Sequence, residues 1–262
     1  MGLAPYGTPR FVDAIRTHLV ELRDDGSIAL NLEHFAFLDK LVMYGPSFVG
    51  LFGPARQPDE ALTQRHADLA RSLQVVTEEI LLAMARRAHA MTGADALCLA
   101  GGVALNCVAN GRILREGPFS DLWVQPAAGD AGGAIGAALW AAHVHHGTPR
   151  VPRKGRDGMR GARLGPAFSD AAIRAVLDRA GVAYRELPAA EGASEVARLL
   201  EEGRVVGVFS GAMEFGPRAL GGRSILADAR RADMQQQLNQ RIKFREGFRP
   251  FAPVCLADRA AD

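Results

Sequence analysis

The sequence predicts an α/β protein built from two consecutive units. Short apolar runs end in glycine and lead into helical patterns, as in ALCLAGG at residues 96–102 and DLWVQPAAGD at residues 121–130. A second series of helical and apolar segments follows a breaker-rich stretch at residues 149–166. Hydrophobic residues make up 48% and charged residues 23% of the 262 residues, which is typical of a globular chain with a sizeable core.

The first unit is expected to contain mostly helices before its glycine-ended strands. A helical pattern covers about residues 9–23, and the short alternating run SIALNL follows at residues 27–32. Apolar residues at three-to-four spacing predict a long helix from about residue 58 to residue 91, which Thr92-Gly93 ends. After the second strand, AGGAIGAALWAAHVHH at residues 131–146 indicates a helix dense in small residues.

Residues 149–166 are interpreted as a linker because they combine breakers, little apolar content and many cations. The cations are Arg150, Arg153, Lys154, Arg156, Arg160 and Arg163. A solvated connector explains them most simply, and a phosphate-facing strip is the alternative.

The second unit repeats the alternation of helices and strands. Helices are predicted in SDAAIRAVLDRAG, where Ser169 is a suitable N-cap, and in SEVARLLEEG and RRADMQQQLNQRIKF. Strands are predicted in AYREL, RVVGVFSG and SILADA.

Bulk properties exclude several classes of protein. The net charge of +2 is too small to indicate a nucleic-acid partner, and no apolar run has transmembrane length. Cys98, Cys107 and Cys255 show no CxxC or zinc spacing, which favours a reducing compartment, so we expect a cytoplasmic protein. No GxxxxGK[ST] motif occurs, so a P-loop is excluded.

Two glycine-rich turns are candidate ligand sites. Gly101 and Gly102 let a ligand approach the backbone, and Asn106 in the following helix is a candidate partner for a sugar hydroxyl; a tight turn without a ligand is the alternative. Asp130, after Gly129 at the head of a helix, is a candidate metal ligand or phosphate neighbour, or simply a residue favoured by the helix dipole. His143, His145 and His146 are interpreted as surface histidines because no acid completes a metal set.

Two cationic stretches in the second unit are candidate phosphate sites. FSGAMEFGPRALGGRS at residues 209–224 places Arg218 and Arg223 among glycines, and arginine forks beside bare backbone suit an anion. Lys243 and Arg245 lie two apart in IKFREGFRPFAP and point the same way only if the chain is extended there. The four cations either converge on a polyphosphate or acyl phosphate, or are scattered surface charges.

Five blocks in order along the chain resemble the NodU/CmcH-type O-carbamoyltransferases. The blocks are MGLAPYG, LCLAGGVALNCVANGRI, QPAAGDAGGAIGAAL, EFGPRALGGRSILAD and LNQRIKFREGFRPFAP. The resemblance implies that residues 1–148 are the C-terminal part of an actin-like (sugar-kinase-like, ASKHA) transferase domain. It implies that residues 149–166 are the linker and residues 167–262 the N-terminal part of a YrdC-like domain.

The resemblance also implies an activity and roles for the candidate residues. The YrdC-like domain would form carbamoyl adenylate from carbamoyl phosphate and ATP, and the actin-like domain would transfer the carbamoyl group to a hydroxyl of a natural-product or sugar acceptor. Gly101, Gly102, Asn106 and Gly129 would bind nucleotide, and Asp130 a divalent metal such as Fe²⁺. Lys243 and Arg245 match a KxR pair, and Arg218 and Arg223 lie in the phosphate-side loop.

Departures from the family pattern predict an incomplete enzyme. Relatives usually carry a preceding half-domain with the histidine ligands of the metal and, after FAP, an SxN motif that contacts the nucleotide. Ala212 and Gly222 stand where relatives tend to have Arg and Asn. We therefore expect this chain to lack activity alone and to need a complementary N-terminal polypeptide or a second copy. A non-catalytic nucleotide-binding remnant and a threonylcarbamoyl-type tRNA-modifying enzyme are the alternatives.

Overall fold

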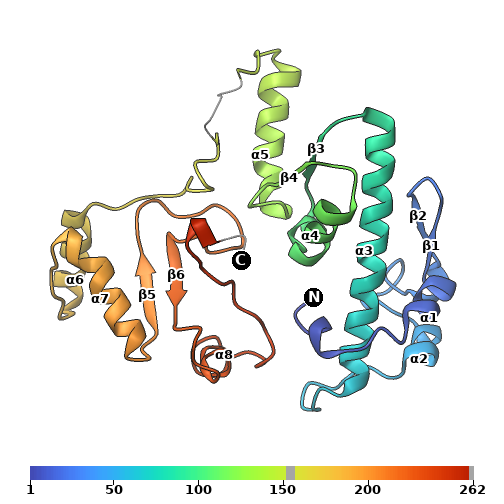
Figure 1. Cartoon of the computed structure of the whole chain (residues 1–262), viewed down its shortest axis with the longest axis horizontal. Coiled ribbons are helices and arrows are strands. Elements are labelled where there is room, and N and C mark those ends of the chain that lie inside the picture. Colours follow the sequence, from blue (N-terminus) through green and yellow to red (C-terminus); the bar gives the residue numbers. More distant parts are fainter. Residues whose placement is uncertain (152–156, 260–262) are drawn as a thin grey trace. The chain divides into compact units, whose positions relative to one another are not determined.

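The computed structural model describes residues 1–151 and 157–259, which divide into two compact units (Figure 1). The first unit spans Met1–Val124 and the second spans Gln125–Asp262. The segment between residue 125 and the predicted linker therefore packs with the second unit. The linker cations Arg153, Lys154 and Arg156 lie outside the described residues.

The first unit is mainly helical and carries two small sheets. Its helices are η1 (Ala4–Tyr6), α1 (Val12–His18), η2 (Leu32–His34), α2 (Pro46–Phe52), α3 (Gln64–Thr92), η3 (Gly102–Leu105) and α4 (Cys107–Glu116). Its strands are β1 (Val20–Leu22), β2 (Ile28–Leu30), β3 (Ala96–Leu99) and β4 (Asp121–Val124). β1 and β2 pair antiparallel, whereas β3 and β4 pair parallel with Ala96 opposite Asp121.

The long helix α3 organises this unit. Thr63 is the N-cap of α3, and its N–H donates a hydrogen bond to His66 Nδ1 at 2.9 Å. Gly93 ends the helix in the left-handed conformation. One core cluster packs Ile15, Leu19, Val20, Phe52 and Val76, and a second packs Ala85, Ile113 and Phe119. The spacing of apolar residues along α3 thus serves two cores, one at each half of the helix.

The N-terminal segment containing η1 is fixed to α3 by a buried carboxylate. Asp68 accepts hydrogen bonds from the Thr8 N–H at 2.8 Å and from Gln64 Nε2 at 2.8 Å, and it pairs with Arg10 at 2.8 Å. Gly7 is required because a β-carbon there would lie 2.0 Å from the Ala67 carbonyl oxygen. These hydrogen bonds, led by that of the Thr8 N–H, lower the pKa of Asp68.

The described part of the second unit combines helices with an antiparallel pair of strands. Its helices are α5 (Asp130–Trp140), the π-helix η4 (Ala141–His145), α6 (Asp170–Ala180), α7 (Ala189–Glu201), α8 (Met234–Gln237), the π-helix η5 (Leu238–Ile242) and η6 (Ala257–Arg259). Its strands β5 (Val206–Phe209) and β6 (Arg223–Leu226) pair with Phe209 opposite Arg223 (Figure 1). The chain is therefore of mixed α/β class, as predicted.

Two predicted elements of the second unit differ in the structure. AYREL is not a strand: residues 182–188 carry no regular secondary structure, and no described segment forms a ladder with them. Side-chain contacts hold this segment instead, such as that of Tyr184 Oη with Asp178 at 3.0 Å. The predicted helix at residues 230–244 is shorter and begins at Met234, and after Gln237 it continues as a π-helix.

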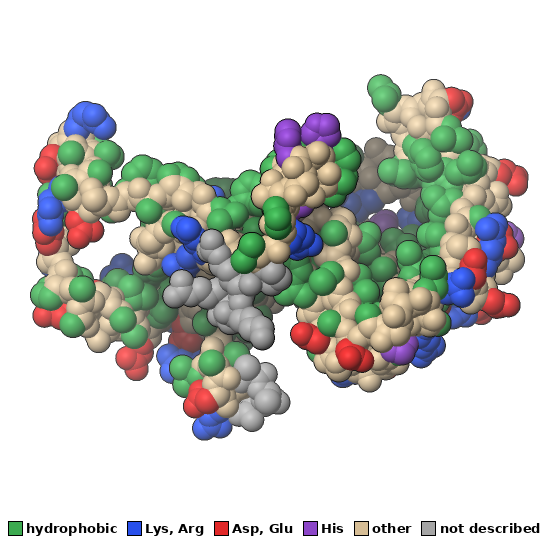
Figure 2. Space-filling view, turned by 90° about the horizontal axis from the view of Figure 1, so that it is seen from above, with side chains coloured by type: hydrophobic (Ala, Val, Ile, Leu, Met, Phe, Trp, Pro, Cys, Tyr) green, Lys and Arg blue, Asp and Glu red, His purple; other side chains and the backbone are tan. Residues whose placement is uncertain are grey.

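Hydrophobic side chains are exposed over much of the surface (Figure 2). Every residue of α5 is at least partly exposed, and Trp140 at its end is 60% exposed. The accessible surface of the chain is 18195 Å². Two separate compact domains of half this mass would together expose about 13,000 Å². The chain therefore exposes more surface than two separate compact domains would, and this comparison does not depend on how the two units are placed.

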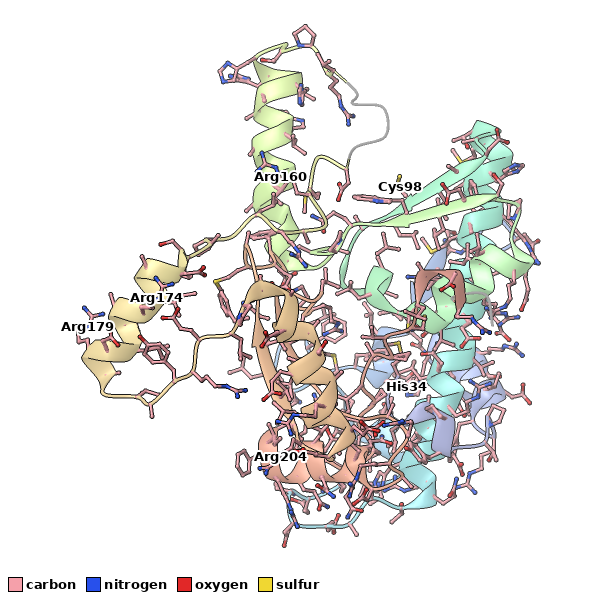
Figure 3. The ribbon with its side chains drawn as sticks, turned by 60° about the vertical axis from the view of Figure 1, so that its left-hand side comes forward. His34, Cys98, Arg160, Arg174, Arg179 and Arg204 are labelled. Atoms are coloured by element: carbon pink, nitrogen blue, oxygen red, sulfur yellow. The ribbon has the colours of Figure 1, made fainter. Side chains whose placement is uncertain are left out.

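The described residues contain no helix long and apolar enough to cross a membrane. The cysteines Cys98, Cys107 and Cys255 are free and exposed, and Cys98 projects from β3 (Figure 3).

Candidate functional site

The glycine turn after β3 leaves room for a ligand beside its backbone. Gly101 adopts a φ of +103°, which a residue with a β-carbon rarely adopts. No atom lies within 4 Å of a β-carbon built on Gly101 or on Gly102, and both residues are exposed. The open side of this turn is compatible with the predicted close approach of a ligand to the backbone.

Asn106 caps α4 and is held by a residue of α3. Its Oδ1 accepts from the Ala109 N–H at 3.2 Å, and its amide exchanges two hydrogen bonds with that of Gln74, at 3.0 and 3.2 Å. Gln74 Nε2 in turn donates to Glu78 Oε1 at 2.8 Å. The Asn106 side chain therefore has a fixed orientation and retains one amide hydrogen for a ligand.

Asp130 is exposed as the first residue of α5, directly after Gly129, which is the N-cap. Within residues 1–151 and 157–259, no group of three or more His, Cys, Asp or Glu side chains could hold a metal ion. One carboxylate does not make a site for a divalent cation, so the described residues do not fit a metal by themselves.

The histidines near the end of α5 have other contacts. His143 Nδ1 lies 2.8 Å from the Thr148 carbonyl oxygen, and the His145 ring stacks on Trp140 with 6.2 Å between centroids. These contacts agree with their interpretation as surface histidines.

The loop between β5 and β6 is built around a buried carboxylate. Glu214 Oε1 accepts from three backbone N–H groups, those of Leu220 at 2.8 Å, Gly222 at 2.5 Å and Arg223 at 3.1 Å. Glu214 Oε2 accepts from Arg223 Nε at 3.1 Å, and Arg223 Nη2 donates to the Glu214 carbonyl oxygen at 2.9 Å. The Glu214 side chain is fully buried. The anion that Arg223 and the glycine backbone bind in this structure is thus part of the chain.

These contacts account for the ionisation of Glu214 and for one of the glycines. Burial raises the pKa of Glu214, but the N–H groups of Leu220 and Gly222 and the Arg223 guanidinium outweigh it and hold that pKa well below the usual range. Gly222 is required because a β-carbon there would lie 2.9 Å from the Ala212 carbonyl oxygen and 3.1 Å from the Glu214 carboxyl group.

Arg218 and Lys243 differ from Arg223 because their side chains have no partner among the residues that the structure describes. Both are exposed, and neither side chain makes a hydrogen bond or ion pair with another residue in the described part of the chain. They are therefore available to an external anion. Arg223, in contrast, has a structural role in holding the loop, and contact with a substrate stays a prediction for it.

Lys243 and Arg245 do not lie on an extended chain. Lys243 has a right-handed helical conformation, and Phe244 between them has a φ of +49°. Arg245 Nε donates to Oδ1 of the buried Asn239 at 2.7 Å, and its guanidinium lies 5.0 Å from the centroid of the Phe251 ring. Lys243 and Arg245 were expected to point the same way only if the chain is extended there, and it is not extended.

Sequence reasoning missed the residues that organise these sites. Gln74 appears in the pattern of α3 only as a polar residue, and its pairing with Asn106 joins residues 32 positions apart. Glu214 stands two residues before Gly216 within the cationic motif itself, so an acid among two arginines and four glycines was the available signal.

Comparison with known proteins identifies the family of this chain. Residues 1–139 match the family model described as carbamoyltransferase N-terminus, and residues 197–262 match that of the carbamoyltransferase C-terminus. The chain belongs to the carbamoyltransferase family, which confirms the predicted resemblance.

Several curated relatives align along the whole chain. An uncharacterized protein of Synechocystis sp. is 50% identical over 265 residues, covering 100% of this chain and 43% of its own length. Nodulation protein NolNO of Sinorhizobium fredii is 40% identical over 99% of this chain and 36% of its own length. Nodulation protein NolO of Bradyrhizobium diazoefficiens is 38% identical over 100% of this chain and 45% of its own length. The chain thus spans less than half the length of these relatives.

Proposed function

We propose that this chain is part of an O-carbamoyltransferase that activates a carbamoyl group as an adenylate and transfers it to a hydroxyl group. The observation that carries the proposal is the ordered match of the N-terminal and C-terminal family models along one chain. The donor substrates would be carbamoyl phosphate and ATP, and the acceptor a hydroxyl-bearing small molecule such as a sugar or natural product.

The proposed reaction has two parts. Hydrolysis of carbamoyl phosphate gives carbamate and phosphate, and a carbamate oxygen then attacks the α-phosphorus of ATP, breaking the bond to the β-phosphate and releasing pyrophosphate. The acceptor oxygen next attacks the carbamoyl carbon, AMP leaves, and the hydroxyl proton is lost. No step here is assigned to a metal, because the described residues do not form a metal site.

The second unit would serve the first part of this reaction. Arg218 and Lys243 are exposed, and their side chains have no partner among the described residues, so their positive charge could stabilise the leaving pyrophosphate. Arg245 and Arg223 would act mainly by holding the chain that carries these two residues, through Asn239 and Glu214 respectively.

The first unit would contribute to the nucleotide site of the transfer step. The open turn at Gly101 and Gly102 gives a phosphate or sugar access to the backbone, and Asn106 offers its remaining amide hydrogen to a hydroxyl. Asp130, which belongs to the second unit, would hold a metal only together with ligands that the described residues do not supply.

The exposed apolar surface favours a second candidate, a non-catalytic or split-enzyme subunit that acts with a complementary polypeptide or a second copy. No residue of α5 is buried, and Trp140 at its end is 60% exposed. Exposed apolar side chains that form a contiguous patch mark an interaction site.

The experiment that separates the candidates is exchange of labelled pyrophosphate into ATP, with and without carbamoyl phosphate. Exchange that requires carbamoyl phosphate would support adenylate formation by this chain. ATP binding without exchange would support the subunit role. Absence of both ATP binding and exchange, also after addition of the remaining segments of a relative, would contradict the proposed function.

A further inference from the structure

The segment that the sequence predicts as a linker is in part a component of the β5–β6 loop. The Phe215 N–H donates to the Ala162 carbonyl oxygen at 2.7 Å, Gly165 N–H donates to Met213 O at 2.9 Å, and Met213 N–H donates to Pro166 O at 3.0 Å. Ala162 is fully buried. Residues 162–166 therefore run beside residues 213–215 with a fixed register, and the position of Arg163 is set by backbone contacts on both sides.

The Arg163 guanidinium lies over two glycines of this loop. A β-carbon on Gly211 would lie 3.3 Å from Arg163 Nη1, and one on Gly221 would lie 3.6 Å from Nη2. Both glycines have left-handed backbone, with φ of +68° and +98°. Gly211 follows β5 and Gly221 precedes β6, so one planar guanidinium covers the glycines at both ends of the loop.

The charge of Arg163 is not neutralised within the described residues. The oxygens of Glu214 are used by the loop N–H groups and by Arg223. Arg163 is exposed, and its side chain makes no hydrogen bond or ion pair with the described part of the chain. Its donors, like those of Arg218, are therefore available to an anion at the open side of the loop.

The backbone before Arg163 is strained, which indicates that its position is maintained at a cost. Arg160, Gly161 and Ala162 have φ of +51°, +64° and +63°, and a left-handed conformation is unfavourable for residues with a β-carbon, such as Arg160 and Ala162. Asp157 supports this turn, because its carboxylate accepts from Met159 N–H and Gly161 N–H, each at 2.8 Å. Such strain is concentrated at functional sites.

We propose that Arg163 contacts a phosphoryl group of the donor substrates at the β5–β6 loop, together with Arg218. This assignment rests on the proposed function, because it names a further residue of the same anion site. The shared chemistry is a phosphoryl dianion, supplied either by the polyphosphate of the nucleotide or by the acyl phosphate.

Calorimetric titration of the whole chain with pyrophosphate and, separately, with carbamoyl phosphate tests this role. The variants are Arg163→Gln, Arg163→Lys and the matched control Arg160→Gln, which removes the same charge from an exposed residue of the same segment (Figure 3). Arg163→Gln should weaken binding roughly ten-fold or more, Arg163→Lys less, and Arg160→Gln about two-fold at most, because only a contacting guanidinium donates charge-assisted hydrogen bonds. The anion that is affected identifies the source of the phosphoryl group.

The outcomes separate this role from the proposed function. If the wild-type chain binds either anion and Arg163→Gln binds it equally well, the role of Arg163 is refuted and the proposed function stands. If the wild-type chain binds neither anion, the role of Arg163 is refuted, and the proposed function is then decided by pyrophosphate exchange after addition of the remaining segments of a relative. Weakened binding accompanied by faster hydrogen exchange of the Leu220 and Gly222 amides would show that Arg163 supports the loop, and would overturn direct contact.

Discussion

Replacing Glu214 with alanine tests whether the β5–β6 loop is held by its internal carboxylate. The change removes the acceptor of three backbone N–H groups and of the Arg223 guanidinium, and the Glu214 side chain is fully buried. Removing one partner of a buried ion pair costs about 3–5 kcal/mol, and each buried donor without an acceptor about 1–3 kcal/mol. Arg223 is partly exposed and can be rehydrated, so we expect about 3–5 kcal/mol in total, a large part of the stability of one domain.

The assay combines urea unfolding of the second unit with hydrogen exchange of the peptide that contains residues 214–226. In Glu214→Ala the Leu220 and Gly222 amides should exchange much faster, and the unfolding midpoint should fall. Glu186→Ala is the matched control, since its ion pair with Arg174 joins side chains that are 58% and 47% exposed and should contribute less than about 1 kcal/mol. Wild-type exchange in Glu214→Ala, with a loss of stability no greater than that of the control, would refute the reasoning.

Further predictions concern pH, the N-terminal segment and the catalytic assignments. The pKa of Glu214 in the folded chain lies below that of an unfolded glutamate, which is about 4.3, so the unfolded chain takes up the proton first as the pH falls. The second unit should therefore lose stability as the pH falls below about 4.3. In urea unfolding at pH 7 and pH 3.5, the free energy of unfolding of Glu214→Gln should depend less on pH than that of the wild type. Asp68→Ala should speed hydrogen exchange of residues 4–10 without affecting the β5–β6 loop, and unchanged exchange there would show that Asp68 does not anchor the segment. In an assay that includes the remaining segments of a relative, Lys243→Ala should abolish pyrophosphate exchange at an unchanged melting temperature. Arg245→Ala should abolish exchange and also lower the melting temperature, because its partner Asn239 is buried. Equal melting temperatures for the two variants would contradict this difference. Asp130→Ala should spare pyrophosphate exchange and stop carbamoyl transfer, and loss of both would show that the two steps are not divided between the sites as proposed.

Local patterns in the sequence predict the parts of the fold that depend on local interactions. The apolar spacing of α3 and the glycine after Thr92 place the end of that helix, and the apolar runs before the glycine turns are the parallel strands β3 and β4. AYREL has the composition of a strand, but a strand also needs a hydrogen-bonded neighbour, which composition does not supply.

The site depends more on contacts between distant residues, which periodicity does not reveal. The glycines and arginines of the motif predict a site for an external anion, whereas the anion that Arg223 and the Gly222 N–H contact in this structure is the internal carboxylate of Glu214. The pairing of Asn106 with Gln74 and the position of Arg163 over Gly211 likewise require the tertiary structure. Arg163 was predicted as part of a solvated connector because its segment lacks apolar residues, whereas backbone hydrogen bonds fix that segment.

An internal carboxylate at the centre of the β5–β6 loop has a consequence for the entropy of ligand binding. A loop that closes only around its ligand loses backbone freedom at each binding event, and that loss weakens the observed affinity. Here the Glu214 carboxylate is tethered to the loop that it organises, so it stays in place at any dilution and between successive ligands. Its hydrogen bonds are made during folding, so the loop does not have to be reassembled each time a ligand binds and leaves.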